Sequence, residues 1–262
     1  MNDGDLKGAL LEYKKGLRVL ESVTRKDHPS VATIYNNIGC VLESMGDYEG
    51  ALAKYNQAIA SRLLVFGEGH PVTASSYNNI GCVLEKMGDY EGSLSKHKQA
   101  LAIEEFVFGK SHPKVATSYN NIGSVLDKMG DYEGALINHK KALAVRLSVS
   151  GKDHPDTARS HNHIGCVLEA MGDYRGALSM LKEALAKRIS ALGKNHPSVA
   201  TTNNNIGSVL YHMGDYDAAL VRFEECLAIR EHILGRDHPY TKSCLKWIEE
   251  TRAQMKIRET LF

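Results

Sequence analysis

The sequence contains few prolines, which interrupt helices, and few tryptophans: six of its 262 residues are proline and one is tryptophan. It also lacks a charge excess, with 32 Lys and Arg against 31 Asp and Glu, so bulk electrostatics gives no attraction to nucleic acid or to an acidic membrane. No apolar run approaches the roughly 18 residues of a membrane-spanning helix, and the acidic, polar first residues do not resemble a signal peptide. We therefore expect no nucleic-acid partner and no membrane partner. The hydrophobic content of 43% predicts a large buried core.

Every proline follows a histidine, and successive prolines are 42 residues apart, at Pro29, Pro71, Pro113, Pro155, Pro197 and Pro239. Such spacing is typical of a repeat array and argues against an ordinary globular fold with prolines scattered among loops. We predict a single solenoid domain over 1–262. It contains a half repeat (1–27), five full repeats (28–69, 70–111, 112–153, 154–195 and 196–237) and a C-terminal capping helix (238–262).

Each repeat is predicted to contain two helices, which we call helix A and helix B. In the first repeat, helix A covers about 29–45, because proline is tolerated in the first helical turn and apolar residues then recur at helical spacing. Helix B covers about 48–66. Gly46 ends helix A, Asp47 caps helix B and Gly67 ends helix B, and the same punctuation returns in every repeat.

The helix pairs are predicted to stack, because no single pair can bury both of its apolar faces. Gly39 lies inside helix A at a cost of about 1 kcal/mol relative to alanine. Its recurrence in all five repeats therefore predicts close packing there. Trp247 is predicted to pack the capping helix onto the last repeat. At the other end, the first helix matches a helix B without its helix A, so either the array is part of a longer one or this helix caps it or docks on something.

Three short patterns resemble the tetratricopeptide repeat (TPR), namely Ile38-Gly39-x-x-Leu42, Ala51-x-x-x-Tyr55 and Ala58. The 42-residue period, the His-Pro start and the Asn-Asn pair resemble the repeats of kinesin light chain and nephrocystin-3-like proteins over nearly the whole chain. This resemblance implies an all-α, right-handed α-solenoid of antiparallel helix pairs, about 12 helices in all. It also implies that helix A of each repeat lines a concave groove, which kinesin light chains use to hold extended, often acidic, cargo peptides.

Asparagine recurs on one face of helix A, away from Ile38 and Leu42. Because asparagine is a poor interior helix residue, and because its amide can both donate to and accept from a peptide backbone, we predict that it binds a peptide ligand. The alternative is an asparagine ladder that only bridges neighbouring helices, and both can hold. The predicted groove residues are Asn36, Asn78, Asn120, Asn162 and Asn204, with Asn37, Asn79, Asn121, His163 and Asn205 beside them.

Charged residues vary more along the same face. An acidic row runs along it with Lys86 and Lys128 at its side, which leaves open whether the ligand is acidic or basic; the row is Glu43, Glu85, Asp127 and Glu169. In the fourth repeat, Arg159 and His163 lie four residues apart. Together with Lys128 they form a hypothetical anchor for a carboxylate, which arginine can bind through two hydrogen bonds. The alternative is sequence drift on a solvated surface.

No set of residues indicates catalysis, a cofactor or a metal site. Gly109-Lys110-Ser111 resembles the end of a phosphate-binding loop, but Glu104 stands where that motif needs its first glycine. His161 and His163 point apart on a helix and no further ligand cluster follows. We expect no enzyme activity, and we expect the His-Pro histidines to cap helices or pack between turns.

The five cysteines are predicted to be free thiols of a reducing, cytoplasmic compartment. Cys40, Cys82 and Cys166 share one repeat position, at a spacing of about 10 Å that exceeds the disulfide limit of about 7 Å. Cys226 and Cys244 complete an odd count. The sequence thus predicts an adaptor or scaffold that binds an extended peptide in an asparagine-lined groove. The alternative is a structural segment that associates with copies of itself, end to end through its open N-terminal helix, without a peptide ligand.

Overall fold

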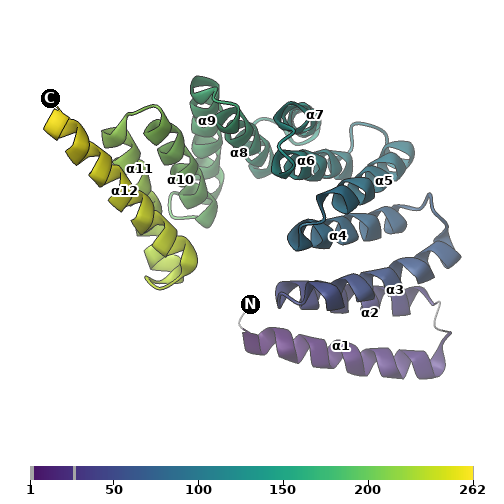
Figure 1. Cartoon of the computed structure of the whole chain (residues 1–262). Helices are drawn as coiled ribbons and strands as arrows, with labels where there is room; N and C mark the ends of the chain where they lie inside the picture. The colour runs from purple at the N-terminus through teal and green to yellow at the C-terminus, as the bar shows by residue number, and fades with distance from the viewer. Residues whose placement is uncertain (1–2, 26–27, 262) are drawn as a thin grey trace. The chain divides into compact units, whose positions relative to one another are not determined.

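The computed structural model describes residues 3–25 and 28–261, except for the side chains of 3, 4 and 259–261. The described residues form twelve α-helices and no β-strand (Figure 1), as the sequence predicts. The helices are α1 (Asp3–Val23), α2 (Pro29–Ser44), α3 (Tyr48–Phe66), α4 (Pro71–Met87), α5 (Tyr90–Phe108), α6 (Pro113–Lys128), α7 (Tyr132–Ser150), α8 (Pro155–Ala170), α9 (Tyr174–Leu192), α10 (Pro197–His212), α11 (Tyr216–Leu234) and α12 (Pro239–Leu261).

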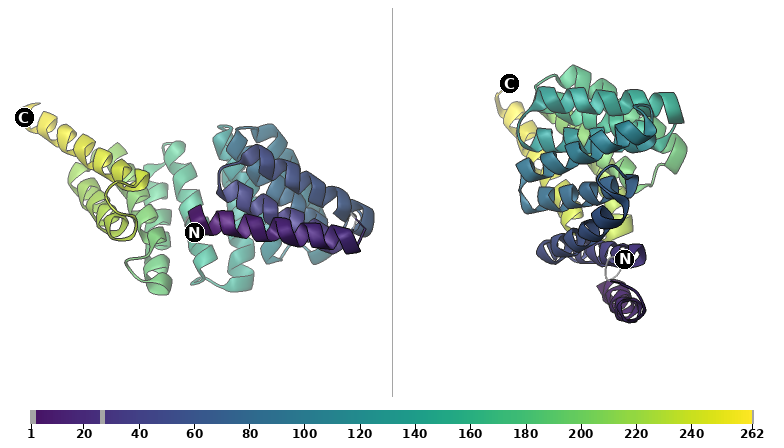
Figure 2. Two further views of the ribbon diagram at one scale, coloured as in Figure 1. Left: turned by 90° about the horizontal axis from the view of Figure 1, so that it is seen from below. Right: turned by 90° about the vertical axis from the view of Figure 1, so that its right-hand side faces the viewer.

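The chain divides into two compact units, Met1–Asp131 and Tyr132–Phe262, each of which is a stack of helices. In the first unit each helix from α1 to α5 packs against the next, and α4 also contacts α6. In the second unit α7 to α12 pack in the same sequential way, and α8 also contacts α10. Figure 2 shows the stacking within each unit from two further sides. Each unit is therefore built as an α-solenoid, in which the A helices of neighbouring repeats adjoin.

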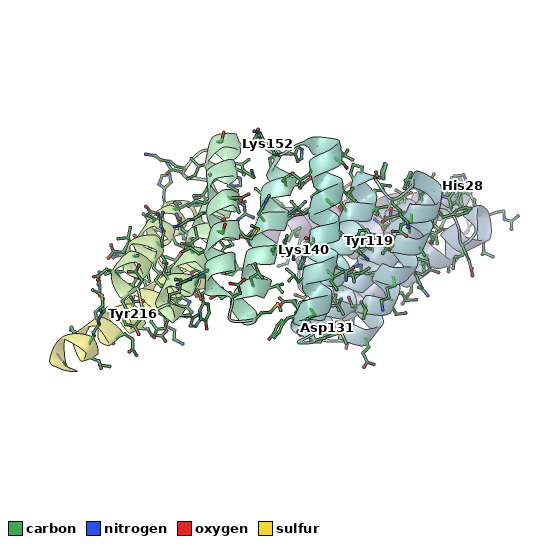
Figure 3. All side chains as sticks on the ribbon, turned by 90° about the horizontal axis from the view of Figure 1, so that it is seen from above. His28, Tyr119, Asp131, Lys140, Lys152 and Tyr216 are labelled. Atoms are coloured by element: carbon green, nitrogen blue, oxygen red, sulfur yellow. The ribbon has the colours of Figure 1, made fainter. Side chains whose placement is uncertain are left out.

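The helix boundaries follow the predicted punctuation. α3 begins at Tyr48 and ends at Phe66 as expected, and Asp47 caps it by accepting a hydrogen bond from the Gly50 N–H over 2.9 Å. Gly46 and Gly67 have φ of 82° and 78°, in the left-handed region that favours glycine. The predicted capping role of the His-Pro histidines is also confirmed, because the imidazole Nδ1 accepts from the backbone N–H two residues on at His28 (labelled in Figure 3), His70, His112, His154, His196 and His238.

The recurring helix A glycine marks a close approach of helix B, as predicted. A Cβ atom added at Gly39 would lie 2.6 Å from the ring of Tyr55, a fully buried side chain of α3. Alanine would therefore require the ring to move out of a packed core. The same contact recurs between Gly81 and His97, Gly165 and Leu181, and Gly207 and Phe223.

The last helix closes the second unit through aromatic packing. The indole of Trp247 in α12 stacks on Phe223 of α11, with ring centroids 5.4 Å apart, and meets Tyr211 of α10 edge to face at 5.5 Å. This confirms the predicted role of Trp247. Among the described helices none is long and apolar enough to span a membrane.

Candidate functional site

Within each unit, the asparagines of helix A occupy two positions that recur from repeat to repeat, and we call these positions the first and second columns. The first column is Asn36, Asn78, Asn120, Asn162 and Asn204. The second column is Asn37, Asn79, Asn121, His163 and Asn205. Asn120 and Asn162 are buried, with 9% and 7% of their surfaces exposed, and the other eight residues are half-buried. Solvent thus reaches most of this face, although less freely than a fully exposed surface would allow.

Adjacent A helices are bridged by amide-to-amide hydrogen bonds. In the first unit Asn79 Nδ2 donates to Asn36 Oδ1 over 2.9 Å. In the second unit Asn205 Nδ2 donates to Asn162 Oδ1 over 3.3 Å and to the Cys166 sulfur over 3.2 Å. The bridging role that the sequence left as an alternative is therefore present within each unit.

Asn78 is held by three partners from two neighbouring helices. Its Oδ1 accepts from His97 Nδ1 over 2.8 Å, and its Nδ2 donates to Ser118 Oγ over 3.0 Å and to a Glu104 carboxylate oxygen over 3.3 Å. The neutral imidazole of His97 therefore carries its proton on Nδ1. Burial lowers the pKa of His97 to about 4, which keeps the ring uncharged at neutral pH. This amide is a structural element of α4, α5 and α6.

A buried charged position on helix B contacts the asparagine columns. In the first repeat, Arg62 Nη1 donates to Ser76 Oγ over 2.6 Å and approaches Asn36 Oδ1 at 3.5 Å. In the fourth, Arg188 Nη1 donates to Thr202 Oγ1 over 2.5 Å and to Asn162 Oδ1 over 3.4 Å. Sequence reasoning missed this position, although its 42-residue recurrence was a visible signal: Arg62, Glu104, Arg146, Arg188 and Arg230.

Three of these arginines, Arg62, Arg146 and Arg188, are buried and form no ion pair with any described residue. Burial lowers the pKa of Arg146 to about 10, so the guanidinium stays charged at neutral pH. Hydroxyl and carbonyl oxygens take the place of carboxylates around it, namely Ser160 Oγ at 2.6 Å and the Asp156 carbonyl at 3.2 Å. The interior beneath the asparagine face therefore carries positive charge at Arg62, Arg146 and Arg188, whereas the second repeat has Glu104 at this position.

Three of the four residues of the acidic row contact a base of the following repeat. Lys86 Nζ lies 2.7 Å from a Glu43 carboxylate oxygen, and Lys128 Nζ lies 2.8 Å from Glu85. In the second unit His212 Nδ1 lies 3.2 Å from Glu169. The hydrogen bond to Glu43 raises the pKa of Lys86. Lys86 and Lys128 are therefore engaged in inter-repeat ion pairs that offset the charges of Glu43 and Glu85.

The two charged candidates of the fourth repeat have separate surroundings. Arg159 is half exposed and pairs with Asp156 one turn earlier on α8. His163 stacks on His139 of α7, with ring centroids 5.0 Å apart. Burial, followed by the nearby His139 and arginine charges, lowers the pKa of His163 to about 3. The ring is therefore neutral at physiological pH, and of these two side chains Arg159 alone can attract a carboxylate by charge.

Two asparagines of the first column keep an unpaired acceptor. The Oδ1 atoms of Asn120 and Asn204 are buried and accept no hydrogen bond from any described residue. Buried polar atoms in native proteins usually have a partner. A hydrogen-bond donor that reached either oxygen after a small side-chain rotation would therefore remove the free-energy cost of a buried acceptor without a partner.

The other motifs show no converging chemistry. Lys110 and Ser111 lie in the turn between α5 and α6. His161 and His163 have separate partners, because His161 Nδ1 contacts the Thr157 carbonyl at 2.9 Å and its Nε2 contacts Glu183 at 3.2 Å. In the described part of the chain, no group of three or more His, Cys, Asp or Glu side chains is placed to hold a metal ion.

Stacked helix pairs with a shared polar face define the class of helical repeat proteins. Sequence models described as tetratricopeptide repeat match residues 1–63, 72–148, 114–190 and 199–240. The chain belongs to the tetratricopeptide repeat family. Repeats of this family generally mediate protein–protein interactions and are typically non-catalytic.

Solved structures support the same fold. BtubC (BKLC) from P. vanneervenii superposes with a TM-score of 0.73 at 20% identity, over 89% of this chain and 94% of that one. A protein described as a kinesin light chain with nearly identical TPR-like repeats, from Podosopora anserina, gives a TM-score of 0.66 at 18% identity, over 79% and 98%. The fold is therefore shared with kinesin light chain-like repeat proteins. No curated protein matches the chain by sequence.

Proposed function

We propose that this chain is an adaptor or scaffold module that binds an extended peptide along the A helices. The observation that carries the proposal is the pair of asparagine columns, in which half-buried amides recur and two acceptors, on Asn120 and Asn204, lack a donor. A peptide N–H is a suitable donor for such an acceptor once a small side-chain rotation brings the buried oxygen to the surface. An asparagine side chain has two donors and one acceptor oxygen, so it can bind a peptide backbone whatever the side chains of that peptide.

The hydrogen bonds between columns favour binding, because they fix the amides before a ligand arrives. Asn79 uses one Nδ2 hydrogen to hold Asn36 and retains further hydrogen-bonding capacity. Side chains that are already ordered lose less conformational entropy when a ligand binds. The bridging ladder and the peptide-binding role are therefore compatible.

Charge along the face favours recognition of backbone over strongly charged side chains. Lys86 and Lys128 pair with two of the four residues of the acidic row, Glu43 and Glu85, while buried arginines lie beneath the amides. We expect an extended segment whose backbone lies on the asparagines, with a carboxylate near Arg159 as the one charged contact. Because repeats of this family are typically non-catalytic, we propose no enzymatic role. The free thiols favour a cytoplasmic location.

The test is selection of peptides from a random library by the full chain, followed by affinity measurement with Asn37→Ala/Asn121→Ala. These two asparagines are half-buried and, unlike Asn78, do not hold α5 and α6 together. Loss of one good hydrogen bond at each site should weaken binding at least about fivefold. The matched control is Asn56→Ala, an exposed asparagine of α3, with melting temperatures measured for all variants. Equal affinities for the wild type and the double variant would reject the proposal.

A second candidate function is self-assembly through α1. Three large apolar side chains of this helix are exposed, Leu11 at 54%, Val19 at 65% and Val23 at 73%. They fall within about 120° of the helix circumference, so a further helix could cover them together. Light scattering over a range of concentrations should then show association that Leu11→Glu/Val19→Glu abolishes. A wild-type chain that stays monomeric at high concentration would exclude this candidate.

A further inference from the structure

Four successive junctions between a helix B and the next helix A carry the same residue types at two facing positions. An alanine of helix B is followed eighteen residues later by a serine or threonine of helix A, and both are buried: Ala58/Ser76, Ala100/Ser118, Ala142/Ser160 and Ala184/Thr202. At the last junction both positions change together, to Cys226 and Cys244. These two cysteines are also fully buried.

The paired replacement brings two thiols into contact. Cys226 lies on α11 and Cys244 on α12, and their Sγ atoms are 2.8 Å apart. A disulfide needs about 2.05 Å between the sulfurs, so small rotations of the two side chains suffice to join them. The two cysteines do not form a C-x-x-C motif, and their contact depends on the packing of α12 against α11.

A guanidinium group lies next to one of the sulfurs. Arg230 Nη1 is 3.2 Å from Cys244 Sγ and 2.8 Å from the Tyr240 carbonyl oxygen, which fixes the side chain between α11 and α12. The hydrogen bond with Cys226, and then the charge and hydrogen bond of Arg230, lower the pKa of Cys244 against the opposing effect of burial. The thiolate is the reactive form of cysteine, so Cys244 is suited to be the attacking sulfur.

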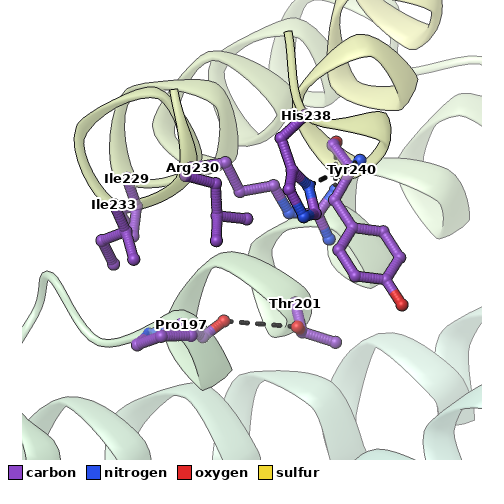
Figure 4. A pocket seen from close by; sticks show the side chains of 8 residues that line it. Pro197, Thr201, Ile229, Arg230, Ile233, His238 and Tyr240 are labelled. Atoms are coloured by element: carbon purple, nitrogen blue, oxygen red, sulfur yellow. Dashed lines mark hydrogen bonds between the residues drawn. The ribbon is translucent and has the colours of Figure 1, made fainter. Parts of the chain in front are cut away.

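A cavity adjoins this guanidinium group. Arg230 lines a cavity of about 450 Å³ at the start of α12, beside His238 and Tyr240 (Figure 4). Pro197 and Thr201 of α10 form the facing wall. A peroxide molecule that enters this cavity meets the guanidinium whose Nη1 contacts Cys244.

We propose that Cys226 and Cys244 are a modification site at which a peroxide-class oxidant forms a disulfide that joins α11 to α12. The Cys244 thiolate attacks one peroxide oxygen, the O–O bond breaks, and hydroxide leaves and is protonated to water. The resulting sulfenic acid is attacked by Cys226 sulfur, the S–O bond breaks, and the oxygen leaves as a second water. Two thiols lose two electrons and two protons, and one hydrogen peroxide becomes two waters.

The disulfide would hold the capping helix onto the last full repeat covalently. Trp247 already packs α12 on Phe223, and the cysteines add a link at a second point along the same interface. In a reducing compartment such a bond is transient and is reversed by small thiols. Oxidation would therefore reduce the opening of α12 without altering the asparagine columns.

The experiment uses the full chain with Cys40→Ser, Cys82→Ser and Cys166→Ser, which leaves only the proposed pair. After treatment with hydrogen peroxide we expect the loss of two titratable thiols, a mass lower by two hydrogens, and a peptide that links Cys226 to Cys244. Amide exchange along α12 should slow by about tenfold and recover with dithiothreitol. The control is Cys226→Ala/Cys244→Ser, which restores the residue types of Ala142 and Ser160 and should fold without responding to peroxide.

Two results would overturn the proposal. The first is that Cys226 and Cys244 both remain open to alkylation after unfolding, at a peroxide dose that oxidises the exposed Cys40 of the wild type. The second is oxidation of one of the two sulfurs to a sulfinic acid with no cross-link. Alkylation and sulfinic acid formation are both measured on the reduced wild type and the triple variant. Neither measurement therefore depends on whether Cys226→Ala/Cys244→Ser folds.

Discussion

Asn79 donates a hydrogen bond from its Nδ2 to the Oδ1 of Asn36 one repeat earlier, over 2.9 Å. Asn205 and Asn162 repeat this relationship in the second unit. In these two pairs the second-column amide reaches back to the preceding repeat and orients the first-column amide. A surface of this kind is suited to bind a backbone, because its donors and acceptors recur with the repeat and are held in place.

Replacing Gly81 by alanine is expected to destabilise the first unit by about 1–3 kcal/mol. The new Cβ would lie 2.7 Å from the imidazole of His97, which is fully buried and cannot move away freely. Chemical denaturation measures the change. Gly8→Ala is the matched control, since its Cβ meets no atom within 4 Å, and helix propensity should make that variant about 0.5–1 kcal/mol more stable. Equal effects of the two variants would contradict the packing argument.

Stability is expected to fall as the pH is lowered from about 6.5 to about 4, in part because of His97. Its pKa is lowered to about 4 by burial, whereas an unfolded histidine titrates near 6.5. Over this window the unfolded chain binds a proton that the folded chain does not, which costs up to about 3 kcal/mol of stability.

The variant His97→Leu tests this origin of the pH dependence. Leu181 occupies the same repeat position against Gly165, so leucine fits the packing scheme. Thermal unfolding at pH 8 and pH 5 should show a smaller difference for the variant than for the wild type. An unchanged difference would place the pH dependence elsewhere.

Glu104→Ala is expected to cost about 1–3 kcal/mol, because it leaves buried donors without an acceptor. Ser118 Oγ donates to Glu104 over 2.6 Å, and Asn78 Nδ2 donates over 3.3 Å. Glu104→Arg should be better tolerated, since Arg62 occupies the equivalent position and donates to the Ser76 hydroxyl. Denaturant titration of both variants checks the order. The idea of an interchangeable buried position fails if arginine is the more damaging substitution.

Arg159→Ala is expected to leave stability within about 1 kcal/mol of the wild type, because its pairing with Asp156 is solvent-exposed. For a peptide with a carboxylate placed at α8, affinity should fall by about tenfold, since a charge-assisted hydrogen bond is lost. Arg175→Ala on α9, also exposed, is the control. Fluorescence anisotropy with peptides from the library measures both, and unchanged affinity for every confirmed ligand would remove Arg159 from the binding site.

The helix bounds were predictable because local residues set them. Pro29, Asp47 and Gly67 act within one turn of their own positions, and the observed ends differ from the predicted ones by at most one residue. The contact of Gly39 with helix B and the packing of Trp247 were also predictable. A glycine that recurs inside a helix and a single tryptophan in a mostly polar helix are both unusual, and tertiary packing explains them.

The partners of the candidate site were less predictable, because they depend on the offset between neighbouring helices. A helical wheel of helix A places Glu43 and Asn36 on the same face. It does not show that Lys86 contacts Glu43 or that Asn79 contacts Asn36, each from 43 residues later in the chain. The same limit applies to His163, whose neutral, stacked state comes from α7.

The glycines with positive φ stand at a constant interval of 21 residues, from Gly46 and Gly67 through to Gly235. The turn after helix A and the turn after helix B therefore divide the 42-residue repeat into equal halves, although the two turns differ in length and capping residue. A gene segment cut at any two equivalent glycines encodes whole repeats with their junctions intact. The array can therefore grow or shrink by duplication or deletion of such segments, with a matching change in the number of asparagines presented to a ligand.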